Sequence, residues 1–270
     1  MRYPHMARRL IIVLIIPVFI MTCSSNKLNK TANPEERLDF AMTKFNKGDY
    51  LDAKQEFRII VLNNPGHQVV DQAQFYLAEC HFKMKEYILA MAEYQKLVKM
   101  LPNSQYVDDA QYKIGLCNFN LSPKYSLDQS YTLKTIEELQ KFTEDYPDSE
   151  LKDEAIELIG QCRDKLAQKE FRNAELYRRM QLYQAAAIYY QGILDNYYDT
   201  KYVQDANYWL AVSLKLDEQF DRAIEEFTKF LQKYPDTNRK NDVLSQINTT
   251  KLLQQENLKT EVEKNNSIVH

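Results

Sequence analysis

Glycine is scarce in this sequence, with five residues among 270, and no glycine-rich loop occurs. Loops that hold phosphate groups need closely spaced glycines, because the backbone itself must approach the phosphates. An excess of basic residues is also missing, since 35 Lys and Arg against 38 Asp and Glu give a net charge of −3. Nucleic-acid binding requires clustered Lys and Arg. We therefore expect neither a phosphate-binding loop nor a nucleic-acid partner.

Side chains suited to catalysis or metal binding are few and scattered. No serine or cysteine stands in a nucleophile motif. Metal binding needs clustered ligands, and the histidines are far apart. They are His5, His67, His81 and His270. The sequence therefore predicts no catalytic residues, no metal site and no enzyme activity.

One long apolar run is present, the twelve residues from Leu10 to Met21. A helix that spans a membrane needs about 20 apolar residues, so this run is too short. Three arginines precede it, Arg2, Arg8 and Arg9. A basic start followed by a short apolar run is the pattern of a signal peptide, which we assign to residues 1–22.

The end of this run, Ile20-Met21-Thr22-Cys23, resembles the lipobox of bacterial lipoproteins. The resemblance implies that Cys23 becomes the mature N-terminus and carries N-acyl and S-diacylglycerol lipid, with residues 23–33 as the tether. Thr22 is bulkier than the small residue usual before that cysteine, so an ordinary signal peptide with a chance cysteine is the alternative. Ser24 is not the Asp that tends to retain lipoproteins on the inner membrane. The resemblance therefore implies an anchor in the outer membrane, at its periplasmic face.

A pattern recurs through the rest of the chain with a period of 37 residues, apart from a longer step between Gly115 and Ala174. Small residues recur at one position, followed twelve residues later by a second alanine and later by an aromatic residue and a proline. The first position holds Ala41, Ala78, Gly115, Ala174 and Ala211, and the second holds Ala53, Ala90, Ala186 and Ala223. A fixed period of this length is typical of a helical solenoid.

These marks resemble the tetratricopeptide repeat, in which two helices pack at small residues. The resemblance implies an all-α superhelix of five helix pairs. Repeats one to three occupy 34–147, with an eight-residue insertion near Pro123, and repeats four and five with a capping helix occupy 148–258. The first helix of repeat four has no breaker between 151 and 180. Residues 259–270 are expected to be disordered.

The remaining cysteines are odd in number and give little support for a disulfide framework. Cys80 and Cys117 occupy the same position of successive repeats. Packed helix axes lie about 8–10 Å apart, whereas a disulfide tolerates Cα separations up to about 7 Å. A bridge would need both residues on the contact line, so we expect Cys80 and Cys117 to be small apolar residues in a helix seam.

Five such repeats behind a lipobox, with the overlong helix and linkers such as Tyr146-Pro147-Asp148-Ser149, resemble the BamD family. This resemblance implies a scaffold lipoprotein of the outer-membrane β-barrel assembly machine. Its expected partners are the periplasmic domains of the barrel subunit, the C-terminal signals of unfolded outer-membrane proteins and further accessory lipoproteins.

The first helices of the repeats are expected to line a concave groove. In repeats one to three the groove positions are largely apolar or aromatic, which favours a binding surface because a monomer rarely exposes such a strip. The expected client-binding residues are Leu38, Met42, Phe45, Phe75, Phe82, Tyr112, Leu116 and Phe119. In repeat four, Arg178, Arg179 and Tyr189 are the candidates for binding the barrel subunit.

Two alternatives stay open at this stage. The first is another envelope lipoprotein of the same fold, such as a pilus or secretin assembly factor or a Tol–Pal-associated cell-division protein. The second is an enzyme such as a peptidoglycan hydrolase that uses the repeats as a platform, for which the mature chain leaves no room for a catalytic domain.

Overall fold

A computed structural model describes residues 32–268, with side chains to residue 264. The predicted signal peptide, Cys23 and most of the tether lie outside this range. Every regular element in the described range is a helix. The helices are α1 (Pro34–Asn46), α2 (Tyr50–Asn63), α3 (Val70–Lys83), α4 (Tyr87–Met100), α5 (Val107–Leu121), α6 (Ser130–Asp145), α7 (Lys152–Arg179), α8 (Tyr183–Asn196), α9 (Val203–Leu216), α10 (Phe220–Lys233) and α11 (Lys240–Ile268).

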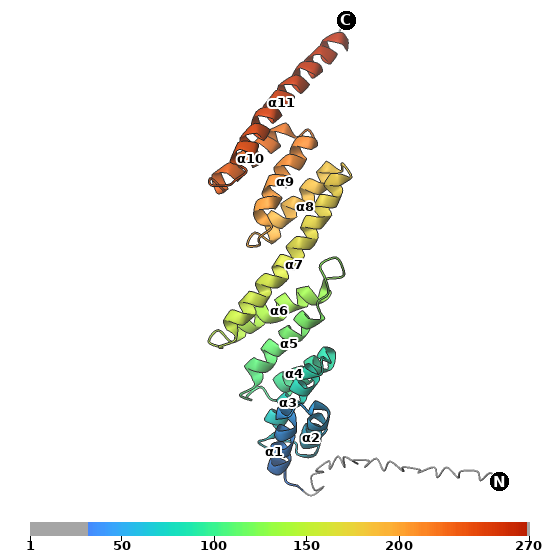
Figure 1. Cartoon of the computed structure of the whole chain (residues 1–270), viewed down its shortest axis with the longest axis vertical. Coiled ribbons are helices and arrows are strands. Elements are labelled where there is room, and N and C mark those ends of the chain that lie inside the picture. The colour runs from blue at the N-terminus through green and yellow to red at the C-terminus, as the bar shows by residue number, and fades with distance from the viewer. Residues whose placement is uncertain (1–31, 269–270) are drawn as a thin grey trace, which may run out of the picture.

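The helices stack in chain order along one long axis, from α1 at one end to α11 at the other (Figure 1). Each helix packs on the next, so α1 to α10 form five helix pairs and α11 lies against α10. The predicted all-α tetratricopeptide superhelix is therefore confirmed. None of the described helices is both long enough and apolar enough to cross a membrane.

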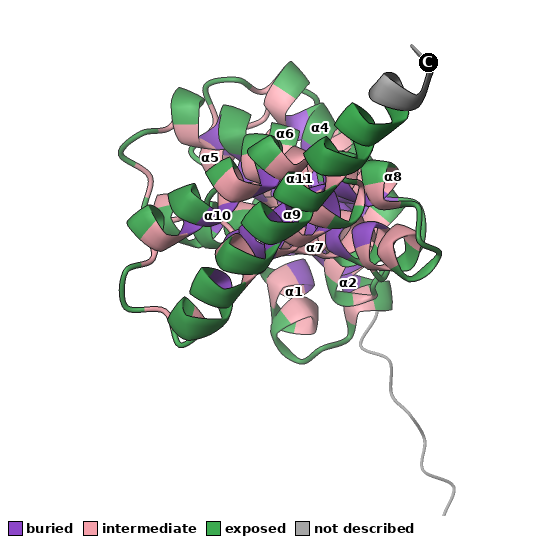
Figure 2. Cartoon of the chain, turned by 90° about the horizontal axis from the view of Figure 1, so that it is seen from above, coloured by how far each residue is buried: buried purple, intermediate pink, exposed green. Residues whose placement is uncertain are grey.

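Small residues sit where the two helices of a pair cross. Ala78 in α3 and Ala90 in α4 are fully buried, and the ring of Tyr94 is buried beside them. The close approach leaves no room for larger side chains at the alanines, because protein interiors are packed as densely as organic crystals. Seen along the axis, buried residues gather on the inner faces of the helices, whereas α11 is largely exposed (Figure 2).

The long helix α7 belongs to two apolar clusters. Its first half contributes Ala155 and Leu158 to a cluster with Phe142 of α6. Its second half contributes Phe171 to a separate cluster with Tyr190 of α8. The predicted uninterrupted helix over 151–180 is thus present, and it connects the two halves of the array.

The insertion between α5 and α6 packs against the middle of α7. Lys165 Nζ donates to Ser122 Oγ at 2.7 Å, and Lys169 Nζ donates to the Leu127 carbonyl at 2.9 Å. Within the insertion, Gln129 donates to the Leu127 carbonyl at 3.1 Å. The extra residues of repeat three therefore support the extra length of α7.

Helix α11 corrects the expectation for the C-terminus. The sequence predicted a capping helix to residue 258 and a disordered tail, yet α11 continues to Ile268. Val243 is fully buried against α9 and α10, whereas Leu252 and Leu258 are exposed. The stretch after 258 contains no proline or glycine that would end a helix, which explains the continuation.

Cys80 and Cys117 are free and buried, as predicted, and Cys162 is free and buried too. Burial raises the pKa of the Cys80 and Cys117 thiols to about 12 and that of Cys162 to about 11. A thiol with so high a pKa stays protonated near neutral pH and is a poor nucleophile. These cysteines therefore act as small packing residues.

Candidate protein-binding groove

A seam of half-buried side chains joins successive first helices of the repeats. At each step, a residue near the end of one first helix lies against a residue of the next first helix. We call these side chains the first-helix seam. They are Phe45 with Tyr76, Phe82 with Lys113, Phe119 with Lys165, and Arg178 with Trp209.

The seam begins with aromatic contacts in repeats one and two. The rings of Phe45 and Tyr76 meet edge to face with centroids 5.1 Å apart. Lys113 Nζ lies 4.8 Å from the centroid of the Phe82 ring, a cation–π distance. Lys113 also forms an ion pair with the buried carboxylate of Glu79 at 3.0 Å. Its position is therefore fixed from two sides.

Glu79 is held in a polar cluster beneath the seam. Its carboxylate accepts a hydrogen bond from the Tyr94 hydroxyl as well as the ion pair with Lys113. Burial and the nearby Glu79 carboxylate raise the pKa of Tyr94, so this hydroxyl remains a donor near neutral pH. A buried charge is tolerated only when it is paired and hydrogen-bonded, as here.

Further along, lysine and arginine cover the aromatic rings. Lys165 Nζ lies 5.7 Å from the Phe119 ring centroid, and the Arg178 guanidinium lies 4.1 Å from that of Trp209. Aromatic rings flanked by cations suit a partner that presents both apolar surface and negative charge.

Three of the predicted groove residues are wrong as surface contacts. Leu38 is 7% exposed, Phe75 8% and Tyr112 2%. Phe75 contacts the Tyr94 ring of α4 and Tyr112 contacts the Phe142 ring of α6, in each case the second helix of the same repeat. These side chains pack within the apolar clusters between helices, so little of their surface is open to a ligand.

The other five predicted groove residues remain partly accessible. All of them pack against the apolar clusters with one side, and they are Met42, Phe45, Phe82, Leu116 and Phe119. Each is half-buried in the described structure. They therefore form a narrower strip than the sequence suggested, centred on the seam.

The three candidates for partner binding in repeat four lie in different surroundings. Arg178 is part of the seam, over Trp209. Tyr189 is half-buried and stacks on Tyr177 with ring centroids 5.1 Å apart. Arg179 is exposed, and its Nε donates to the Glu175 carbonyl at 3.4 Å. Of the three, Arg179 is the residue most available to a partner.

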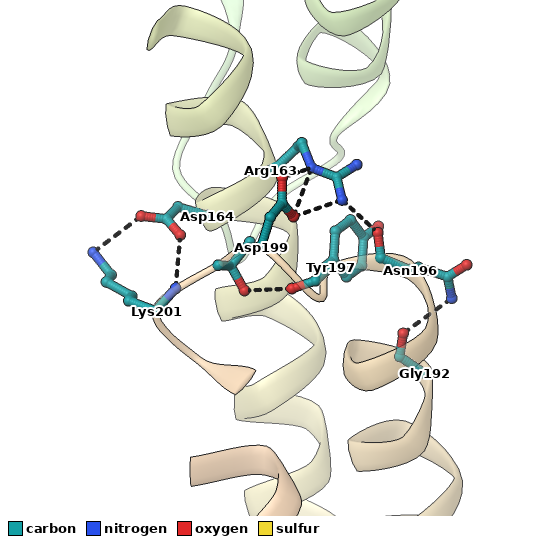
Figure 3. Close-up of polar contacts among 8 residues, drawn as sticks. Arg163, Asp164, Gly192, Asn196, Tyr197, Asp199 and Lys201 are labelled. Atoms are coloured by element: carbon teal, nitrogen blue, oxygen red, sulfur yellow. Dashed lines mark hydrogen bonds and ion pairs between the residues drawn. The ribbon is translucent and has the colours of Figure 1, made fainter. Parts of the chain in front are cut away.

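A polar cluster at the α8–α9 loop was not predicted (Figure 3). Arg163 of α7 donates to both carboxylate oxygens of Asp199 at 2.7 and 2.8 Å and to the Asn196 carbonyl at 2.8 Å. The bond to Asn196 satisfies a carbonyl that the end of α8 leaves without a helical partner. This repeat has Tyr197-Tyr198 where the others have a proline, and that absence was the one available signal for a substitute cap.

The charges in this cluster reinforce each other. Hydrogen bonding to Arg163 lowers the pKa of Asp199, and the same bonds raise the pKa of Arg163. Lys201 in the same loop pairs with Asp164 of α7 at 3.5 Å. The loop is thus attached to the middle of α7 at two points (Figure 3).

No group of three His, Cys, Asp or Glu side chains in residues 32–264 is placed to hold a metal ion. Aromatic and basic side chains such as those of the first-helix seam are enriched at protein–protein interfaces.

Comparison with known proteins identifies the family. Residues 31–215 match a family described as outer membrane lipoprotein, YfiO, and residues 205–237 match a tetratricopeptide repeat family. A comparison with curated proteins finds no match.

Solved tetratricopeptide structures resemble the chain in fold alone. The TPR2AB domain of yeast Sti1, in its complex with pHSP90, has 14% identity and a TM-score of 0.43, covering 83% of this chain and 84% of that one. The P58(IPK) TPR domain has 18% identity and a TM-score of 0.40, covering 82% of this chain. The match spans 56% of that domain's own length. A repeat protein of Parabacteroides merdae has 12% identity and a TM-score of 0.35, covering 86% and 78%.

The family match extends from the end of the predicted tether through four complete helix pairs and most of α9. This chain belongs to the YfiO family of outer membrane lipoproteins.

Proposed function

We propose that this protein is a scaffold subunit of the outer-membrane β-barrel assembly machine. In this proposal, lipid on Cys23 anchors the chain at the periplasmic face of the outer membrane. The first-helix seam binds the C-terminal signals of unfolded outer-membrane proteins, and the surface near Arg179 binds the periplasmic domains of the barrel subunit. Membership in the outer membrane lipoprotein family supports the location.

The observation that carries the client-binding part is the accessible strip of the seam. Phe45, Phe82 and Phe119 recur on three successive first helices, and Lys113 and Lys165 lie beside the last two rings. A C-terminal signal that ends in an aromatic residue presents a ring and a carboxylate together. Rings could pack on the phenylalanines while the carboxylate is attracted by the lysines.

Titration with a synthetic peptide tests this part. The peptide is taken from the C-terminus of an outer-membrane β-barrel protein and ends in an aromatic residue. Combined Phe82→Ala and Phe119→Ala substitution is expected to weaken binding by about 2 kcal/mol, or roughly 30-fold. Ile88→Ala with Leu89→Ala, which truncates two exposed side chains of α4, is the control. Equal affinity of the two double variants would contradict the proposal.

Crosslinking tests the barrel-subunit part. A photoreactive residue at position 179 or 189 of the lipid-anchored chain is expected to crosslink to a β-barrel protein with repeated periplasmic domains. If only positions in other repeats crosslink to that protein, the barrel-subunit contact lies in those repeats and not near Arg179. Recovery of a pilus, secretin or Tol–Pal component in its place would favour the alternative envelope lipoproteins.

A further inference from the structure

The first half of α7 occupies the position that the first helix of a separate repeat would occupy. In repeat two, Ser104 Oγ of the following linker donates to Asp71 at the start of α3 at 3.0 Å. One repeat later, Ser149 Oγ donates to Asp108 at the start of α5 at 3.3 Å. The start of α7 is therefore placed relative to α5 as the start of α5 is placed relative to α3. Ala155, in the first turn of α7, is fully buried.

In the complete repeats, fixed positions of the first helix contact the second helix of the same pair. Gln74 of α3 donates to the Glu93 carbonyl of α4 at 2.9 Å. Gln111 of α5 donates to Glu138 of α6 at 3.0 Å. The corresponding residue of α7, in register with the linker contacts, is Ile156, and its side chain is 51% exposed.

The small residue at the helix crossing shows the same contrast. A Cβ atom added to Gly115 of α5 would come within 2.4 Å of Leu139 in α6, so α6 occupies that space. The corresponding residue of α7 is Gly160, and an added Cβ atom there meets nothing within 4 Å. The first half of α7 thus has the crossing residue of a helix pair without the second helix.

The same side of α7 is covered further along. Ala167, Phe171 and Ala174 follow Gly160 at helical spacing of seven, eleven and fourteen residues, and all three are buried beneath α8 and α9. The Arg163–Asp199 contact marks where this coverage begins, because it ties the α8–α9 loop to α7. The uncovered stretch is about 12 residues, or about 18 Å, which is three helical turns.

We call this stretch the α7 seat. It consists of exposed residues that share one side of α7, namely Asp153, Ile156, Glu157, Gly160 and Gln161. Two carboxylates flank an isoleucine and a glycine, and the side chain of Gln161 donates to Glu157 at 3.2 Å. The α7 seat therefore combines a glycine, at which another helix can approach closely, with negative charge.

We propose that the α7 seat binds a short amphipathic α-helix of a partner protein. The partner helix packs a stripe of small and apolar residues on Ile156 and Gly160, and it approaches Gly160 as α6 approaches Gly115 in repeat three. Its lysine or arginine side chains pair with Asp153 and Glu157. This surface is separate from the first-helix seam, so the proposal does not depend on the function proposed above.

A helix taken from this chain is the most direct probe. Among the five second helices, α4 has a positive balance, with two lysines against one glutamate in YILAMAEYQKLVKM. We would titrate a fluorescent, lactam-bridged peptide of this sequence into the full mature chain and follow anisotropy. Saturable binding is expected, and amide exchange is expected to slow in residues 152–163 of the chain.

Two open glycines provide a matched pair of variants. Gly160→Leu fills the α7 seat and is expected to weaken peptide binding at least tenfold. Gly192→Leu on α8 adds the same side chain where an added Cβ atom also meets nothing within 4 Å, and it should leave affinity unchanged. Glu157→Lys is expected to weaken binding severalfold at low salt, with a smaller effect at high salt.

Several outcomes would overturn the inference. These are failure of the peptide to bind, equal affinity of the two leucine variants, or slowed exchange outside residues 152–163. Sedimentation velocity tests whether a second copy of this chain binds the α7 seat. Self-association that is lost in Gly160→Leu would show such a copy there in place of a partner protein.

Discussion

Replacing Gly115 by alanine tests the packing of the helix pairs directly. The added methyl group would lie 2.4 Å from Leu139 Cδ2 and 2.7 Å from its Cγ, far inside normal contact. Leu139 has no exposed surface and is enclosed by Tyr112 and Phe142, so it has little room to move. Overpacking of this kind costs about 1–3 kcal/mol, while alanine gains about 1 kcal/mol over glycine in helix propensity.

The matched control is Gly160→Ala, where the same methyl group meets nothing within 4 Å. This variant should gain the propensity of about 1 kcal/mol without the packing cost. The two variants should therefore differ by about 1–3 kcal/mol, or several degrees in melting temperature for a chain of this size. Thermal melts by far-UV circular dichroism measure the difference. If Gly115→Ala is as stable as Gly160→Ala, the reasoning about the crossing is refuted.

Three further predictions concern packing, thiols and pH. Ala90→Leu and Ala223→Leu overfill fully buried crossings and should each cost about 1–3 kcal/mol in urea unfolding; unchanged midpoints would contradict this. The three buried cysteines should be silent to Ellman's reagent near neutral pH in the folded chain and react after denaturation, whereas fast reaction of the native chain would show that they are accessible. Because Arg163 lowers the pKa of Asp199, the contact stabilises the fold above the ordinary carboxyl pKa of about 4 and is lost as pH falls through the lowered value. Asp199→Asn should therefore flatten the loss of melting temperature between pH 5 and pH 3, and an unchanged pH profile would argue against the contact.

The periodic features of the sequence predicted the fold well. Two helices can pack closely only where small residues lie at their crossing, as Ala78 and Ala90 do. This pattern can therefore be read from the sequence of a single helix pair. The long helix was predictable for a similar reason, since nothing between 151 and 180 breaks a helix. The C-terminal end of α11 was missed because polar composition alone does not end a helix.

The binding strip was predicted less well, because its geometry depends on how helices cross. Phe75 and Phe82 both fit the expected pattern of groove positions, yet Phe75 packs into its own helix pair and Phe82 stays half-buried beside Lys113. Seven residues separate them, so they lie on nearly the same side of one helix. Which of the two is covered depends on the position of the neighbouring helices, and spacing in the sequence does not contain that information.

Helix α7 has a mechanical consequence for the whole array. It is a single hydrogen-bonded rod that is embedded in one apolar cluster through Leu158 and in another through Phe171. Neither half can rotate against the other about a loop at this point, because the connection is itself helical and would have to bend or break. A force or a ligand that tilts one end of α7 therefore swings the opposite half of the protein as a lever, with the largest displacement at the far tip.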